Sequence, residues 1–299
     1  MIEYNPKAWV SLITHSYSRH VMRTLRPALV FMAGYSGLLC YLILDVFRLH
    51  EKDFHSTIGM HSILGIVLGL FLVFRTNSAY DRWWEGRKLW GLMVNNTRNL
   101  AAKLNAILPK DDTENRTFFR VMIGNFAIAA KEHLRKGVLI SDLEPTGADF
   151  EERFRDVKHV PNRISIMLYE RMNDLYMKKI ISGDHLIIMD KELKELSDVM
   201  GGCERIKGTP IPYSYSMYIK KFIFIYIITL PFGFVTQTAY FTIPIVVLIS
   251  FVMFSVELIA EEIEDPFGRD VNDLPTDDLA VKIHNNIAEM LIVQSTAKV

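Results

Sequence analysis

Uncharged stretches, arranged in two widely separated pairs, dominate the pattern of hydrophobic and polar positions. Residues 27–44 and 54–74 contain no formally charged side chain, and neither does the run 222–256. A membrane helix needs roughly 20 apolar residues, although about 17 suffice where the bilayer thins. One helix over 222–256 would reach roughly 50 Å and overshoot a hydrocarbon core of about 30 Å. The pattern therefore predicts four transmembrane helices, the last two joined by a tight turn near residues 237–244.

The middle of the chain is charged and predicts a helical cytosolic body. Apolar positions recur at helical spacing in 89–108, 118–134 and 164–181. Turn-forming residues predict breaks at 109–112, 143–149, 159–162, 201–205 and 208–212. No stretch of any length alternates between apolar and polar residues as a half-buried strand would. We therefore expect an all-α membrane protein, with a buried helical hairpin in a soluble protein as the alternative.

Positive charge assigns the orientation in the membrane. Arginines and lysines gather before the first run, after the second and before the third, at Arg19, Arg23, Arg26, Arg75, Arg82, Arg87, Lys88, Lys220 and Lys221. Positively charged flanks stay on the cytoplasmic side. We therefore expect a multi-pass protein of the cell (inner) membrane with both termini in the cytoplasm. The expected division is a cytosolic N-terminal segment 1–26, transmembrane helices at 27–74 and 222–258, a helical cytosolic domain 75–221 and a cytosolic C-terminal segment 259–299.

Composition and motifs exclude several functions. A net charge of zero gives no sign of a nucleic-acid partner. The two cysteines and nine histidines are scattered, which argues against a disulfide or a metal site. The chain has no glycine-rich phosphate loop, no His-Glu-x-x-His helix and no Gly-x-Ser-x-Gly elbow. We therefore expect neither an enzyme nor a cofactor.

The second uncharged run carries two stripes at helical spacing. Gly65 and Gly69 form a small-x-x-x-small pair, which lets helices approach closely. A second set repeats every four residues on a face about 100° away, namely Ser62, Ile66, Leu70 and Phe74. Packing against lipid or another helix explains such a stripe, and so does the wall of a pore.

Three segments together resemble the signature of the bacterial bestrophin homologues. They are FRTNSAYDRWWEGR at 74–87, followed closely by Leu-Trp-Gly, GGCERIKGTPIP at 201–212, and EEIEDPFG at 261–268. They follow the family's order, and the resemblance covers nearly the whole chain. It implies a homo-pentamer around a central pore, embedded in membrane lipid, with four membrane helices and a helical cytosolic body in each subunit.

The resemblance also gives the second membrane helix a function. It implies a narrow apolar neck at Ile66, Leu70 and Phe74, with Ser62 as a further pore-lining residue. Five copies of each neck residue would stack as apolar rings, and a narrow apolar tube gates by losing its water. We therefore expect passive conduction of monovalent ions. The alternative is a membrane-anchored helical scaffold or receptor that does not conduct.

One departure from the family concerns calcium. Eukaryotic bestrophins carry an uninterrupted acidic run after Pro-Phe-Gly that helps to build a calcium clasp. In this chain only Asp270 and Asp273 are acidic within 269–273, and Arg269 is a cation. The departure argues against calcium control, and Asp270 and Asp273 are the candidate ligands if calcium binds.

A second departure concerns the cytosolic exit of the pore. Asp184 falls in the segment 181–185, where the resemblance places a second constriction that is typically apolar. Five carboxylates in a ring would favour cations and repel anions. Crowding would raise the pKa of some of them. We therefore expect cations to be slightly favoured over chloride. The alternative is that Asp184 caps a helix starting near His185.

Overall fold

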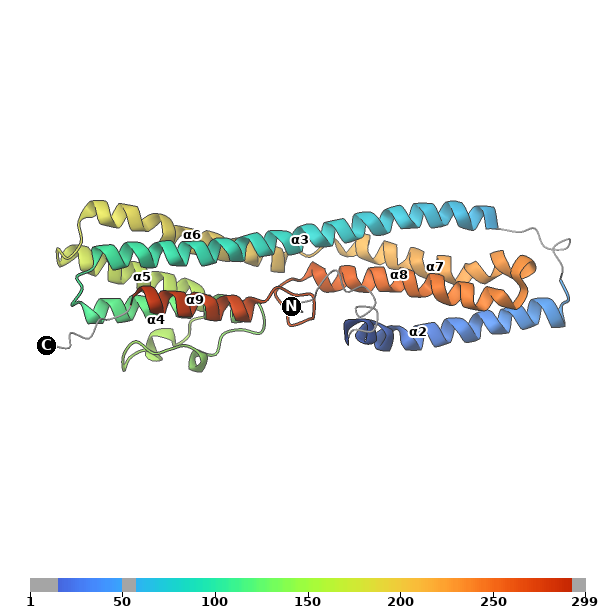
Figure 1. The fold of residues 1–299 in the computed structure, drawn as a ribbon, viewed down its shortest axis with the longest axis horizontal. Coiled ribbons are helices and arrows are strands. Elements are labelled where there is room, and N and C mark those ends of the chain that lie inside the picture. The colour runs from blue at the N-terminus through green and yellow to red at the C-terminus, as the bar shows by residue number, and fades with distance from the viewer. Residues whose placement is uncertain (1–15, 50–57, 292–299) are drawn as a thin grey trace. The chain divides into compact units, whose positions relative to one another are not determined.

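The computed structural model describes residues 16–49 and 58–291, and within them it is built from helices, with no strand. The predicted all-α class is therefore confirmed for this part of the chain. The α-helices are α2 (Ser16–Tyr41), α3 (Ile58–Ile107), α4 (Thr113–His133), α5 (Val160–Met177), α6 (Gly183–Gly208), α7 (Tyr213–Thr238), α8 (Thr242–Glu264) and α9 (Thr276–Met290) (Figure 1). Short turns of other helix types are η1 (Leu42–Val46), η2 (Ile140–Asp142), η3 (Glu152–Phe154) and η4 (Ala239–Phe241).

Parts of three predicted segments lie outside the described residues. They are the first fifteen residues of the segment 1–26, the start of the second uncharged run at 54–57, and the last eight residues of the segment 259–299. The remaining chain divides into two compact units. The first comprises the described residues up to Arg82 together with Pro210–Glu264 and Asp270–Asn272, and the second takes the rest. Helix α3 contributes residues to both units.

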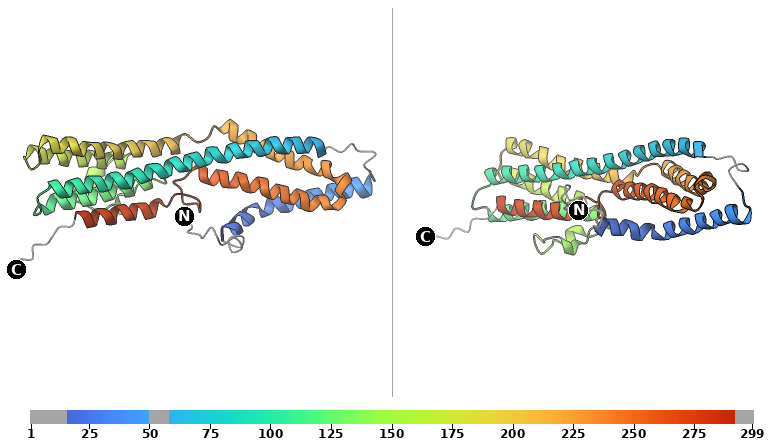
Figure 2. Two further views of the ribbon diagram at one scale, coloured as in Figure 1. Left: turned by 45° about the horizontal axis from the view of Figure 1, so that its top comes forward. Right: turned by 45° about the vertical axis from the view of Figure 1, so that its right-hand side comes forward.

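The first unit consists of apolar helices that pack side by side. Helix α8 contacts both α2 and α7, as both views of Figure 2 show. Their shared core buries apolar side chains such as Met32, Leu68, Ile227 and Val246. By length and composition alone, His20–Val46, Ile58–Ile107 and Tyr213–Glu264 are long and apolar enough to cross a membrane.

The predicted turn between the last two apolar helices is confirmed. Helix α7 ends at Thr238 and α8 begins at Thr242, with η4 between them. Ala239 adopts a positive φ of 47°, which reverses the chain within a few residues. The hydroxyls of Thr238 and Thr242 lie 2.8 Å apart and hydrogen-bond across this turn. At about 1.5 Å per residue, α7 is roughly 39 Å long and α8 roughly 35 Å, so each is long enough to cross a hydrocarbon core of about 30 Å.

Gly65 brings α3 close to α7. A Cβ at this position would lie 2.8 Å from the hydroxyl of Tyr226, so only glycine fits without a shift. His61 lies one turn earlier, where its Nε2 is 3.2 Å from the hydroxyl of Thr229 on α7. A Cβ at Gly69 would have no neighbouring atom within 4 Å. Within the single chain, the close approach predicted from the pair of glycines is therefore confirmed at Gly65, and at Gly69 it stays a prediction.

The second unit has its own apolar core, formed by the rest of α3 together with α4, α5, α6 and α9. Trp90, Phe119 and Phe126 are fully buried in it. The connection between α4 and α5 is held by Asn125, whose amide donates to the carbonyl of Glu144 at 2.7 Å and accepts from its N–H at 2.9 Å. Arg135 donates to both carboxylate oxygens of Asp277 at 2.9 Å, which ties α9 to the end of α4.

Two predicted helix limits in this unit are wrong. The glycines at 201 and 202 were expected to break the chain, but α6 runs through them to Gly208. A Cβ on Gly202 would lie 2.9 Å from Leu89 Cδ2, so the missing side chain makes room for Leu89. The helix predicted over 164–181 ends at Met177, because Lys179 adopts a positive φ of 60°.

The adjacent glycines of α6 allow a direct test of this packing. We expect Gly201→Ala to stabilise the protein by up to about 1 kcal/mol, because alanine is the better helix former and nothing lies within 4 Å of the added methyl group. Gly202→Ala gains the same propensity, but its methyl group must push Leu89 aside, and overpacking costs typically about 1–3 kcal/mol. The apparent melting temperatures of the two purified variants measure the difference. Equal shifts would show that Leu89 yields freely.

Candidate functional site

The first half of α3 has one packed face and one uncovered face. The buried residues recur at helical spacing, at His61, Leu68, Leu72, Arg75 and Ala79. The predicted pore stripe lies on the other side of the helix. Of its apolar members, Ile66 is 75% exposed, Leu70 56% and Phe74 53% in the single chain. The structure thus brings these three residues together as an apolar ridge that α2, α7 and α8 leave uncovered.

The residues of the ridge are evenly spaced along the axis of α3, and a polar residue precedes them. Residues four apart in a helix lie about 6 Å apart along its axis. Ser62 is exposed one turn before Ile66, and its hydroxyl donates to the carbonyl of Ile58 at 2.9 Å. The next exposed positions after Phe74 are polar, at Asn77 and Ser78, and Asp81 is exposed one turn farther along. The apolar part of the ridge is therefore short, at about 12 Å from Ile66 to Phe74.

Arg75 holds α3 from the packed side. Its side chain is fully buried, and its Nη2 donates to Glu264 Oε2 at 2.7 Å. Its Nε lies 3.5 Å from Oε1 of Glu257, which is also buried. Burying charges is costly unless opposite charges meet in good geometry. The two carboxylates of α8 therefore fix where Arg75 points, and with it the rotation of α3.

Glu264 connects all three signature segments within the first unit. Besides binding Arg75, its carboxylate accepts the backbone N–H of Ile211 at 2.9 Å. Its backbone carbonyl accepts from Arg82 Nε at 3.0 Å. Arg75 and Arg82 belong to the first signature segment, Ile211 to the second and Glu264 to the third. One glutamate of the third segment therefore contacts both of the other segments.

The same three segments also meet within the second unit. A Cβ on Gly86 would lie 3.2 Å from the ring of Phe267, which is almost completely buried. Arg205 pairs with Glu85, and Leu89 packs where Gly202 lacks a side chain. The signature of this chain is thus a set of contacts between residues far apart in sequence.

Asp184 lies in the first turn of α6, but it is not the cap of that helix. Ser182 is the N-cap: its hydroxyl accepts the N–H of His185 at 3.3 Å. In return, Nδ1 of His185 accepts the N–H of Ser182 at 3.4 Å, which completes a capping box. The alternative explanation of Asp184 as a cap is therefore wrong. Its side chain is exposed, in the turn where the helix dipole favours a negative charge.

The connection between α5 and α6, which precedes Asp184, borders an open hollow and contains both charged and apolar side chains. The hollow has a volume of about 530 Å³ and is lined by Tyr176, Met177, Lys179, Ile180, Ile181 and Ser182. Lys178 and Lys179 are exposed there, whereas Ile181 is buried. The predicted aperture therefore carries both signs of charge within a few residues.

The two calcium candidates differ in their surroundings. The side chain of Asp273 is buried, with Oδ2 2.6 Å from the position that a Cβ on Gly268 would take. Asp270 is exposed. Calcium binding at these two residues stays a prediction.

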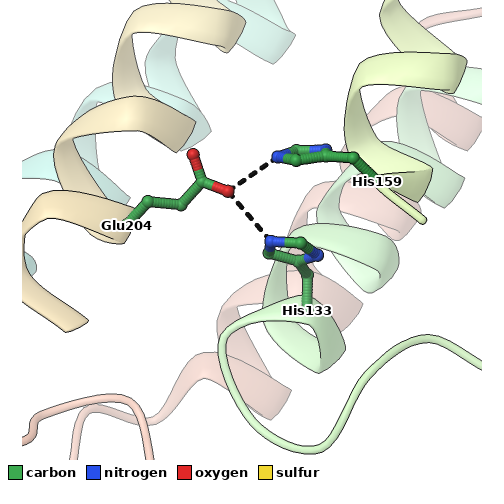
Figure 3. A group of neighbouring side chains, drawn as sticks. All are labelled: His133, His159 and Glu204. Carbon is green, nitrogen blue, oxygen red and sulfur yellow. Dashed lines mark hydrogen bonds and ion pairs between the residues drawn. The ribbon is translucent and has the colours of Figure 1, made fainter. Parts of the chain in front are cut away.

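One cluster escaped the sequence-based search altogether. His133, His159 and Glu204 bring one ligand atom each within 4.8 Å of one another (Figure 3). The two histidines lie 71 and 45 residues before Glu204. No motif search could have found a set with such spacing, because only the packing of α4, α5 and α6 assembles it.

Long apolar helices, an uncovered apolar ridge and a charged anchor are the features of an all-helical membrane protein. The family described as Bacterial/Fungal Bestrophin protein matches residues 1–289. A voltage-dependent anion channel-forming protein of Nostoc is 38% identical over 235 residues, which are 76% of this chain and 76% of the relative. A protein of the same name from Escherichia coli K12 is 35% identical over 238 residues, 78% and 77% of the two chains.

The solved structures agree with these relatives. A bacterial bestrophin homologue from Klebsiella pneumoniae superimposes with a TM-score of 0.79 at 30% identity, over 88% of this chain and 97% of that one. The chain belongs to the bestrophin family, a family of membrane channel proteins. The resemblance inferred from the three signature segments is thereby confirmed.

Arg75→Gln tests the anchor. Removing one partner of a buried charge pair typically costs about 3–5 kcal/mol, because the charges that remain are left without compensation. We therefore expect a large fall in the apparent melting temperature of the purified protein. Lys220→Gln is the matched control, since Lys220 pairs with Glu261 at an exposed site, where such pairs contribute about 0.2–1 kcal/mol. Similar shifts for both variants would contradict the anchoring role of Arg75.

Proposed function

We propose that the chain forms a homo-pentameric channel in which monovalent ions pass through a neck lined by Ile66, Leu70 and Phe74. One observation carries the proposal: the three side chains form an exposed apolar ridge on α3, opposite the face that packs on the other helices of the unit. An exposed apolar patch of this kind marks a surface that something else must cover or enclose. Around a five-fold axis, the ridges of five chains would enclose a passage.

The dimensions of the ridge suit a gate. Each neck residue would contribute one ring, and the rings would follow one another about 6 Å apart. Water leaves a narrow apolar tube readily, and the barrier for an ion then rises steeply. A neck of about 12 Å is short enough that a small widening restores its water. The polar residues after Phe74 would open onto a hydrated vestibule.

The membrane arrangement follows from the apolar helices. In this proposal α2, α3, α7 and α8 each cross the bilayer once, and lipid covers the outward faces of the outer helices. Both termini and the helical second unit face the cytoplasm, because the flanking arginines and lysines would stay there. The protein would then be a multi-pass component of the cell (inner) membrane.

Observations on the permeant ion point in two directions. Asp184, exposed in the first turn of α6, would place five carboxylates at the cytosolic aperture and favour cations. Lys178 and Lys179, exposed in the same connection, oppose that effect. The curated relatives are named as anion channel-forming proteins. We therefore propose only a slight preference for cations over chloride, which Asp184 determines.

Leu70→Ala tests the neck. Truncating five side chains of one ring widens the passage and makes it easier to hydrate, so we expect an increase in single-channel current or open probability in planar bilayers. Leu248→Ala is the matched control, because Leu248 is 63% exposed on α8, compared with 56% for Leu70 on α3. It loses the same atoms from a helix outside the proposed pore and should leave the current unchanged.

The same recordings distinguish the channel from a scaffold or receptor. If the purified protein and the Leu70→Ala variant both carry no current in any salt, the channel proposal fails. If Leu248→Ala raises the current as much as Leu70→Ala, the pore face of α3 has been assigned wrongly.

Asp184→Asn tests the ion preference. Reversal potentials under asymmetric NaCl report the relative permeability of sodium and chloride. We expect the variant to shift towards chloride, because five negative charges leave the aperture while the side-chain volume is kept. Asp198→Asn removes an exposed carboxylate farther along the same helix and should not change the reversal potential. An unchanged reversal potential for Asp184→Asn would show that Asp184 does not determine the ion preference.

A further inference from the structure

The cluster of His133, His159 and Glu204 lies within the second unit, where the ends of three helices meet. His133 is the last residue of α4, His159 is the N-cap of α5, and Glu204 belongs to the last turns of α6. Both histidines point their Nε2 atoms at one carboxylate oxygen, Oε1 of Glu204, at 2.9 and 2.6 Å (Figure 3). The two rings lie 4.3 Å apart between centroids. Three ligand atoms thus converge on one point from three elements.

The donor set selects a class of ion. Two imidazole nitrogens and a carboxylate are the ligands of zinc and neighbouring transition metals. Calcium and magnesium prefer oxygen ligands and are disfavoured by the two nitrogens. Three protein ligands leave one position of a tetrahedral ion open for water. We propose that His133, His159 and Glu204 bind a divalent transition-metal ion such as Zn²⁺, which joins α4, α5 and α6.

The geometry requires only a small adjustment. Ligand atoms around tetrahedral zinc lie about 3.3 Å apart, since each is about 2.0–2.1 Å from the ion. The nitrogens and the carboxylate oxygen therefore need to separate by roughly half an ångström to admit it. Side-chain exposures are 23% for His133, 29% for His159 and 37% for Glu204, so an ion can reach the site directly from solvent.

His159 has a second role that affects the binding. Its Nδ1 accepts the N–H of Asn162 at 3.1 Å and so caps α5. With Nδ1 as an acceptor, a neutral ring carries its proton on Nε2 and donates to Glu204. Metal binding through Nε2 requires the other neutral tautomer, with the proton on Nδ1, and Nδ1 can then no longer accept the N–H of Asn162. Loss of one N-cap costs much less than a structural metal site contributes, so the exchange is favourable.

The test is a zinc titration of the full-length protein in detergent. Calorimetry measures the binding, and thermal unfolding measures the change in stability. The wild type should bind Zn²⁺, and its melting temperature should rise with zinc but not with magnesium, because an ion that binds only the folded state stabilises it. His159→Asn keeps an excellent helix cap and loses the metal ligand. Glu204→Gln keeps the shape and loses the charge. Each of the two variants should lower zinc affinity by at least roughly tenfold, because even the loss of a residue that only orients a metal ligand typically costs that much.

A matched histidine variant separates this site from general surface binding. His20 lies 3.9 Å from Glu262 in the first unit, so His20→Asn removes a histidine from a different histidine–glutamate pair. It should bind zinc like the wild type. The proposal is overturned if the wild type does not bind zinc, or if His159→Asn and Glu204→Gln bind it as tightly as His20→Asn does. Because neither readout measures current, its failure is independent of the channel proposal.

Discussion

The buried pairing of Arg75 with Glu257 and Glu264 is the interaction on which the first unit depends. A guanidinium with no exposure to solvent is stable only where opposite charge compensates for its lost hydration, and both carboxylates come from α8. Glu264 in turn receives the N–H of Ile211, and its carbonyl receives Arg82. One residue, Glu264, therefore fixes the end of α8, the chain just before α7 at Ile211, and the middle of α3. Few neutral contacts could impose so specific a rotation on a long apolar helix.

That rotation divides α3 between two tasks. Gly65, His61, Leu68 and Leu72 join Arg75 on the packed side, where Gly65 admits the hydroxyl of Tyr226. The ridge of Ile66, Leu70 and Phe74 remains on the uncovered side. A helix with an apolar residue at almost every position has no amphipathic pattern to orient it. The polar anchor supplies the orientation that apolar packing alone would leave undetermined.

Much of the fold could be predicted from sequence because it depends on local composition. The uncharged runs located α2, α7 and α8. The turn between α7 and α8 follows because the run 222–256 is too long for a single membrane helix. The break predicted at the glycines failed because a distant residue decides the outcome: Leu89 packs where Gly202 has no side chain, and α6 continues. The cap of α6 is a local feature, and Ser182 rather than Asp184 supplies it. The ridge was found because its residues are four apart. The histidine–glutamate cluster was missed because its members meet only after α4, α5 and α6 have packed.

The position of Arg75 next to Phe74 explains why the proposed neck can be apolar at all. Consecutive residues of a helix point about 100° apart, so a modest rotation of α3 would bring the arginine towards the axis in place of the phenylalanine. Five guanidinium groups would then form a strongly anion-attracting ring, and a gate that works by dewetting could not exist beside it. The carboxylates of α8 hold these charges on the protein side and neutralise them there. In the proposed channel, the apolar character of the neck is thus a consequence of where charge is buried behind it.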